Sequence, residues 1–297
     1  MSTTFPENMT ASGAALDATP AVRRIALSDL RDALRAGWDD FLAVPSHGLM
    51  LCVIYPVLGI VLARVALGYS LLPLLFPLAA GFALIGPFAA IGLYELSRRR
   101  ERGETPSVWD AMAVLRAPSF GAMLGVGALL FALFGVWIAT AQAIYVANFG
   151  YAPAASIPDF ARQVLTTPQG WMLILIGCGV GFLFALVALC ISVVSFPLML
   201  DRNANAADAM VTSMRVAATN PLPIAAWGLI VAVLLLLGSL PAFLGLAVVV
   251  PLLGHATWHL YRKVLEGGPR LHDETVRPRQ RRSAADFPSS LFPWTRS

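Results

Sequence analysis

The sequence predicts an all-α, polytopic membrane protein with six transmembrane helices, arranged as three helical hairpins that each follow a short interfacial amphipathic helix. Two observations lead to this class. Only 13% of the residues are charged, about half of the roughly 25% typical of a soluble domain. Long stretches also carry no Asp, Glu, Lys or Arg, namely 117–158, 163–200 and 216–261. Because about 20 helical residues cross a bilayer core of about 30 Å, each stretch is long enough for at least one crossing.

The first 44 residues are expected to lie outside the bilayer core. Residues 1–24 contain no apolar segment beside a small-residue cleavage site, so we expect a disordered arm and not a signal peptide. Residues 25–44 are too polar to span and predict an interfacial amphipathic helix. Ser28 is its expected N-cap, with Asp29 and Asp32 in the first turn. The expected apolar stripe has helical spacing and consists of Leu30, Leu34, Trp38 and Phe41.

The six-span membrane domain is predicted to cover residues 45–265. As one helix, residues 216–261 would run about 69 Å, far more than a bilayer. Gly238, Ser239 and Pro241 are turn formers within this run, so two crossings joined by a tight turn fit better. The predicted crossings are about 48–67, 71–96, 120–147, 170–200, 222–238 and 241–261.

The last segment, 266–297, is rich in Pro, Arg and Ser and is predicted to be a basic, disordered tail. Four of its arginines could hold anionic lipid headgroups beside a membrane, although a plain solvated tail is the interpretation that composition favours. These arginines are Arg277, Arg279, Arg281 and Arg282.

The basic residues predict the orientation of the chain. All of the 21 lysines and arginines except Arg64 and Arg162 fall in the N-terminal arm and helix, the 96–119 and 201–221 loops, or the C-terminal tail. Basic residues mark the cytoplasmic side of a membrane protein. We therefore predict a multi-pass protein of the cell inner membrane with both termini in the cytoplasm.

An internal repeat is also predicted. Without gaps, "GPFAAIGLYELSRR" (86–99) aligns with "VPLLGHATWHLYRK" (250–263), and "SFPLMLDR" (195–202) is more loosely similar. Repeats of this kind indicate a repeated structural unit. Here the unit is one surface helix and one transmembrane hairpin, three times over; the alternative is that all hairpins entering from the cytoplasm look similar.

Four stretches resemble a proteobacterial family of predicted integral membrane proteins that is described only as a domain of unknown function. They are "IALSDLRDALRAGWDDF" (25–41), "FPLAAGFALIGPFAAIGLYELSRR" (76–99), "ISVVSFPLMLDR" (191–202) and "PLLGHATWHLYRK" (251–263). The resemblance covers about residues 22–265. It implies six crossings and an inner-membrane location, and it carries no activity or functional residues to transfer.

The candidate site residues lie at the cytoplasmic boundary. His255 and His259 are four residues apart and share one helix face. His47 opens the first crossing, and Glu95 ends the second at the position equivalent to His259. Imidazole and carboxylate groups bind transition metals or haem iron, so these four are a candidate metal site. The interpretation that we favour is that His255 bonds across helices, while His259, Trp258 and Tyr261 belong to an interfacial belt.

The sequence thus favours a non-enzymatic membrane component: a scaffold, an assembly factor or a passive permease without a cofactor. It contains no GxSxG, Walker or HExxH motif. "RRRERGE" (98–104) fits an orientation signal and not a nucleic-acid site. The expected partners are the bilayer and its anionic headgroups, and no oligomeric state is indicated. One alternative is a metal- or haem-binding protein; a second is a secondary transporter, which the lack of acidic residues at mid-membrane disfavours.

Overall fold

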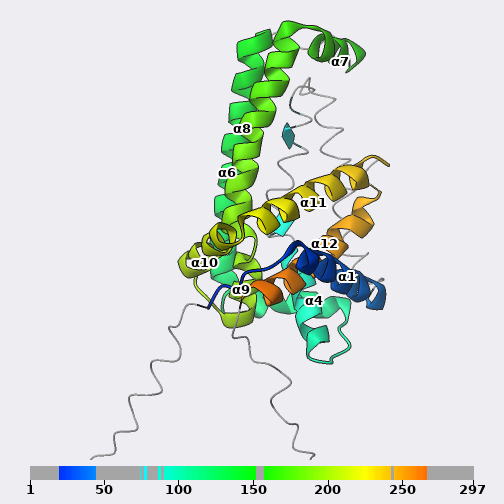
Figure 1. Cartoon of the computed structure of the whole chain (residues 1–297), viewed down its shortest axis with the longest axis vertical. Helices are drawn as coiled ribbons and strands as arrows, with labels where there is room; N and C mark the ends of the chain where they lie inside the picture. The colour runs from blue at the N-terminus through cyan, green and yellow to red at the C-terminus, as the bar shows by residue number, and fades with distance from the viewer. Residues whose placement is uncertain are drawn as a thin grey trace, which may run out of the picture.

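The computed structural model describes residues 20–44, 74, 77–78, 86–87, 90–151, 157–241 and 244–265. Apart from one isolated bridge, the regular structure of this part is helical (Figure 1). Residues 1–19 of the predicted arm (1–24), the first predicted crossing, most of the second predicted crossing and the tail after Leu265 lie outside the described residues.

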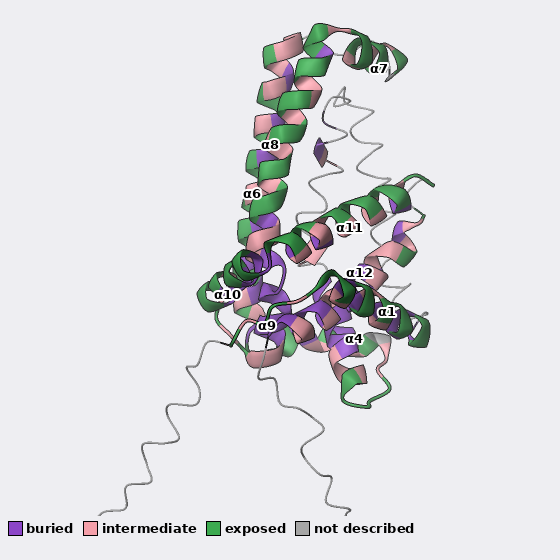
Figure 2. Cartoon of the chain, viewed as in Figure 1, coloured by how far each residue is buried: buried purple, intermediate pink, exposed green. Residues whose placement is uncertain are grey.

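Within the described part, three helical stretches are long and apolar enough to cross a membrane: Phe120–Phe149, Pro168–Arg202 and Pro221–Ser239. They correspond to the third, fourth and fifth predicted crossings. Helices α6 (Phe120–Phe149) and α8 (Pro168–Ser192) pack side by side, joined at their far end through α7 (Ile157–Thr166) (Figure 1). Most of the surface of this hairpin is exposed or only half-buried (Figure 2), as expected for helices that face hydrocarbon.

The fourth predicted crossing is interrupted near its end. Helix α8 ends at Ser192, and after a turn at Val193 and Val194 a separate helix, α9 (Ser195–Arg202), continues the chain. Pro197 explains the interruption, because it has no N–H to donate to the carbonyl of Val193 and its ring clashes with a continuing helix there. The Ser195 hydroxyl shares its one hydrogen between the carbonyls of Ile191 and of Ala209 on α10 (Ala206–Thr219), which ties the bend to α10.

The sixth predicted crossing overlaps helix α12 (Leu246–Val264), which follows α11 (Pro221–Ser239) after a turn that includes Gly245. Helix α12 is not among the three stretches apolar enough to span. Its C-terminal half carries His255, His259, Arg262 and Lys263; of the ten buried residues of α12, six lie in this half, from His255 to Val264. This half therefore belongs to a packed protein core rather than to a lipid-facing surface.

Helix α1 (Leu27–Ala43) lies along α12 and makes its most extensive packing contact there. The two backbones come very close at Gly37, where an added Cβ would lie 2.6 Å from the backbone nitrogen of Ala256 and 2.7 Å from its Cβ. Any side chain at position 37 would force the helices apart, so glycine is required for this approach.

Two expectations for the first helix need correction. Its N-cap is Ala26, whose N–H donates to Asp29 Oδ2 at 2.8 Å, and not Ser28. The buried face also differs from the predicted stripe: Trp38 is exposed, whereas Leu30, Ala33, Gly37, Asp40 and Phe41 are buried. The reason is that α1 buries its small residues against another helix, which needs close backbone approach rather than large side chains.

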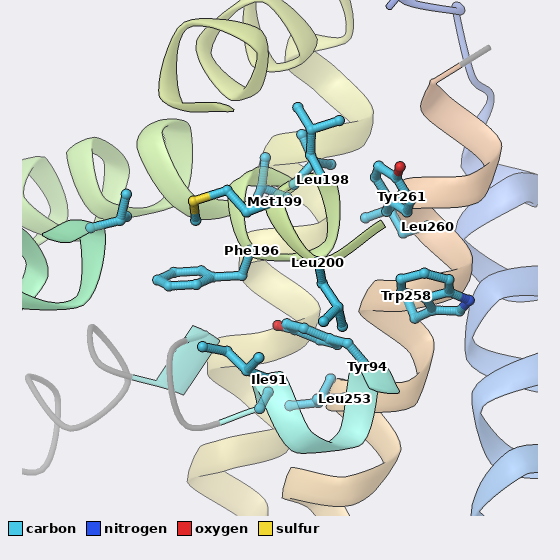
Figure 3. Packing of buried hydrophobic residues seen from close by; sticks show 14 of the residues in the cluster. Ile91, Tyr94, Phe196, Leu198, Met199, Leu200, Leu253, Trp258, Leu260 and Tyr261 are labelled. Atoms are coloured by element: carbon cyan, nitrogen blue, oxygen red, sulfur yellow. The ribbon is translucent and has the colours of Figure 1, made fainter. Parts of the chain in front are cut away.

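The last turns of three helices gather in one core, which we call the hub: α4 (Ile91–Glu101), α9 and the C-terminal half of α12. Leu96, Leu200 and Leu260 occupy equivalent positions before an arginine-containing end of each helix, and all three are buried. Figure 3 shows Leu200 reaching toward Tyr94, with Trp258 and Tyr261 on the neighbouring α12. The three similar segments therefore pack against one another, and the repeat of three hairpins stays a prediction.

Trp258 and Tyr261 differ from the expected interfacial belt. They are 0% and 1% exposed, and their rings contact each other inside the hub. Each side chain also donates a hydrogen bond to a carboxylate, Trp258 Nε1–H to Glu101 at 3.0 Å and the Tyr261 hydroxyl to Asp201 at 2.6 Å. They pack against protein because Glu101 and Asp201 supply the acceptors that water or lipid headgroups would supply at an interface.

Two further sets of hydrogen bonds hold the segment before α1 to the end of α12 and to Asn220. Val22 forms an antiparallel bridge with Leu265, and Arg23 N–H donates to the carbonyl of Val264. Asn220, between α10 and α11, accepts from Ile25 N–H and donates to the Arg23 carbonyl, both at 2.9 Å.

A short helix α5 (Val108–Ala111) and a 3-10 turn η2 (Met112–Arg116) precede α6, as α10 precedes α11.

Candidate functional site

A largely buried hydrogen-bonded group, which we call the Asp40 cluster, joins helix α1 to two of the hub's helices, α4 and α12. It consists of Asp40 on α1, Ser97 and Arg100 on α4, and His255 and His259 on α12. Ser97 Oγ lies 2.6 Å from Asp40 Oδ2 and 2.7 Å from His255 Nδ1, and His259 Nε2 lies 2.8 Å from Asp40 Oδ2. Arg100 completes the cluster by an ion pair with Asp40 Oδ1.

Asp40 is the centre of this cluster, and it is 4% exposed. Burial by itself raises the pKa of the Asp40 carboxyl, but the hydrogen bonds from His259 and Ser97 outweigh burial, so its pKa lies below the ordinary value. The cluster therefore stabilises the ionised form of Asp40. Donors from three helix positions satisfy its two oxygens, as a buried charge requires.

The hydrogen-bond inventory fixes the tautomer of His255. Ser97 has a single hydroxyl hydrogen, and the carboxylate of Asp40 can only accept. Ser97 therefore donates to Asp40, and Nδ1–H of His255 must donate to Ser97 Oγ. In this tautomer His255 Nε2 carries a lone pair. His255 is 0% exposed, and among the described residues this nitrogen has no hydrogen-bond partner.

The order of groups in the Asp40 cluster differs from that of a nucleophilic triad. In a triad the imidazole lies between hydroxyl and carboxylate, and the hydroxyl is open to substrate. Here Ser97 lies between Asp40 and His255, and it is 1% exposed. This arrangement orients side chains and ties helices together.

Glu95 takes part in a different cluster. Its carboxylate pairs with Arg98 at 2.7 Å and with Arg99 at 2.8 Å, and Arg99 also pairs with Asp110 on α5 at 2.7 Å. Positions 95 and 97 point to nearly opposite sides of α4, because successive helical residues are about 100° apart. Ser97, and not Glu95, is thus the residue of α4 that faces the histidines.

The predicted metal-ligand set is therefore divided. His255 and His259 both belong to the Asp40 cluster, and Glu95 belongs to the other cluster. His47 lies outside the described residues. Among the residues that the structure describes, no group of three or more His, Cys, Asp or Glu side chains is arranged to hold a metal ion. The four tail arginines, Arg277 to Arg282, also lie outside the described part.

Two central residues, Asp40 and Ser97, were not among the sequence candidates. One signal was available for Asp40: it is three residues after Gly37 and seven after Ala33, which places it on the small-residue face of α1. Ser97 carried no comparable signal, since a serine at a helix end next to arginines is common on solvated surfaces.

One comparison with known proteins is informative. Residues 75–201 match the model of a family described as "Predicted integral membrane protein (DUF2189)". No curated protein and no solved structure is significantly similar to the chain. The match covers the second predicted crossing through α9, and together with the apolar helices α6, α8 and α11 it supports a membrane protein.

Proposed function

Starting from that match to a membrane-protein family, we propose that the chain is a non-enzymatic component of the bacterial inner membrane, a scaffold, assembly factor or passive permease. The observation that carries this proposal is the hub. The buried carboxylates of the hub and of the adjoining helix α1, namely Glu95 and Asp40, are both engaged by basic or hydroxyl side chains of the same chain. Groups used in this way hold helices together and are not open to a substrate.

The ion pairs of the hub connect segments that are far apart in the sequence. Arg262 on α12 pairs with Glu101 at 3.0 Å and with Asp201 at 3.4 Å, and Lys263 pairs with Asp29 and Asp32 on α1. Because these pairs are partly exposed, each adds little stability by itself, about 0.2–1 kcal/mol. Their joint effect is to set the positions of α1, α4, α9 and α12 relative to one another, which suits a scaffold.

We further propose six crossings with both termini cytoplasmic and the hub on the cytoplasmic side. The basic residues of α4, α9 and α12 all cluster in the hub, in agreement with the positive-inside rule. The elements before α6 and α11 support an interfacial position, since Trp109, Met112, Val211 and Met214 are exposed apolar residues close to arginines. Amphipathic elements of this composition lie in the membrane interface.

One observation favours a second candidate, a metal- or haem-binding membrane protein, namely the lone pair of His255 Nε2. A metal-ligating histidine usually donates its other ring N–H to an oxygen acceptor, as Nδ1–H of His255 does toward Ser97. The first candidate remains preferred, because His259 is already used by Asp40 and no third ligand is at hand in the described part.

Spectroscopy separates the two candidates. Full-length protein purified in mild detergent should be colourless, without a Soret band, and should contain less than one transition-metal ion per chain by elemental analysis. A Soret band or a stoichiometric metal that disappears in His255→Gln, but stays in a variant of the exposed Asp39, would overturn the non-binding scaffold in favour of the second candidate.

A further inference from the structure

A cavity of about 390 Å³ lies between α8, α11, α12 and the residues that lead into α4. Protein interiors are close-packed, so a space of this size is not a packing defect. Its volume falls within the roughly 300–1,000 Å³ range of small-molecule binding sites. The described wall is formed mostly by small and aliphatic residues together with Phe182 and Trp227, and Tyr94, Ser192 and Thr257 are its hydroxyl-bearing members.

The hydroxyls of Ser192 and Thr257 are used within their own helices. Ser192 Oγ donates to the Ala188 carbonyl and Thr257 Oγ1 donates to the Leu253 carbonyl, each at 2.6 Å. A cavity lined in this way offers apolar contact rather than hydrogen bonds. Water needs two to four polar partners to be held in a cavity, so water is a poor occupant here.

The cavity has an outer edge and an inner wall. Phe182 on α8 and Leu229 on α11 are 65% exposed and form its edge, whereas Trp227 and Leu253 are buried and form its inner wall. From Phe182 to Ser192 the wall follows α8 for ten residues, about 15 Å at 1.5 Å per residue. This length is half of a bilayer core of about 30 Å, the thickness of one leaflet.

Because α8 and α11 are apolar enough to cross a membrane, the edge between them opens toward hydrocarbon and not toward water. An unfilled apolar space would forfeit dispersion contacts along its whole wall. The surrounding medium supplies a molecule that restores them. We propose that this cavity binds one acyl chain of a membrane phospholipid, which enters sideways between α8 and α11. The inference rests on the proposed crossing of the bilayer by these two helices.

Photolabelling of the full-length protein tests the proposal. The protein is reconstituted into vesicles of phosphatidylethanolamine and phosphatidylglycerol that contain a phosphatidylethanolamine with a diazirine in one acyl chain. After illumination, the labelled residues are mapped by mass spectrometry. We expect label on Trp227 and Leu253 inside the cavity as well as on Leu183 and Leu236, which are exposed on the outer surfaces of α8 and α11.

A matched pair of variants isolates the cavity. Ala232 lines it and is exposed, so Ala232→Phe fills the space without overpacking the core, whereas the exposed neighbour Val233 does not line it. Ala232→Phe should lose most of the label on Trp227 and Leu253 and keep the label on Leu183 and Leu236. Val233→Phe should keep all four. If Ala232→Phe fails to fold, Ala185→Phe with Val187→Phe as its control repeats the comparison on α8.

Equal labelling of Trp227 in Ala232→Phe and Val233→Phe would overturn the proposal, as would label confined to Leu183 and Leu236. In the latter case both helices still contact lipid, and the proposed crossing stands. Lack of label on all four residues would instead contradict the crossing itself. A photoreactive residue at position 227 that joins to residues 48–67 or to a second copy of the chain would also refute an acyl chain as the occupant.

Discussion

Replacing Asp40 by asparagine removes the central charge of the Asp40 cluster at nearly constant volume. Two of the three contacts of Asp40 are hydrogen bonds to its buried carboxylate, from Ser97 and from His259, and Asp40 is 4% exposed. Hydrogen bonds to a buried charge contribute about 1.5–3 kcal/mol each, and asparagine keeps one acceptor oxygen. The Arg100 side chain is 36% exposed, so its pair with Asp40 is screened and adds less than about 1 kcal/mol. We therefore expect a loss of about 2–3 kcal/mol of unfolding free energy in Asp40→Asn.

The assay is thermal unfolding of the full-length protein in detergent micelles, followed by tryptophan fluorescence. A chain of this size loses about 2–4 °C per kcal/mol, so Tm should fall by about 5–10 °C. The control is Asp39→Asn, which removes the same charge from the exposed neighbour. A double-mutant cycle of Asp40→Asn with Ser97→Ala should show coupling of about 0.5–3 kcal/mol, whereas Asp40→Asn with Glu95→Gln should be additive. If Asp40→Asn and Asp39→Asn have the same Tm, Asp40 is not the tie between α1 and α12.

Three further predictions follow from the same contacts. Gly37→Ala should lower Tm by several degrees, because the added Cβ would lie 2.6 Å from the Ala256 nitrogen and overpacking costs about 1–3 kcal/mol. The control Gly125→Ala, in open space on α6, should leave Tm unchanged. Equal effects of the two variants would contradict the close approach of α1 and α12. Asn220→Ala should speed tryptic cleavage after Arg23 and Arg24 relative to Thr219→Ala, because it removes the bonds to Ile25 and Arg23, and unchanged cleavage would refute that tie. Because the folded-state pKa of Asp40 lies below its ordinary value of about 3.9, the Tm difference between wild type and Asp40→Asn should shrink as the pH falls below about 4; a difference that grows with acid in this range would refute the assignment.

The long apolar helices could be predicted from the sequence, because freedom from charge and length alone determine them. The predicted crossings 120–147 and 222–238 lie within α6 and α11, and 170–200 is covered by α8 and α9 except for the turn at Val193 and Val194. The bend before Pro197 could not be predicted, since proline is also common within membrane helices and only tertiary contacts decide where it ends one.

The candidate site was harder to predict, because it depends on helix phase and on contacts between distant segments. Glu95 aligns with His259 in the repeat, yet the pairing of α4 with α12 turns Ser97 toward the histidines. Helical spacing places Trp38 on the apolar stripe of α1, whereas the close approach of α1 to α12 buries Gly37 and leaves Trp38 exposed. Interactions between residues more than 150 positions apart, such as Ser97 with His255, leave no local pattern in the sequence.

The proposed topology puts the hub in the cytoplasm, with both ends of the chain on that side of the inner membrane. Single cysteines at Arg102, Asp159 and Lys263, in a chain whose own three cysteines are replaced by alanine, test it most directly by labelling of intact cells with a membrane-impermeant maleimide. In intact cells we expect label on the Asp159 position alone, with the Arg102 and Lys263 positions labelled only after the cells are opened. Label on the Arg102 or Lys263 position in intact cells, or equal protection of the Asp159 position, would refute the cytoplasmic position of the hub.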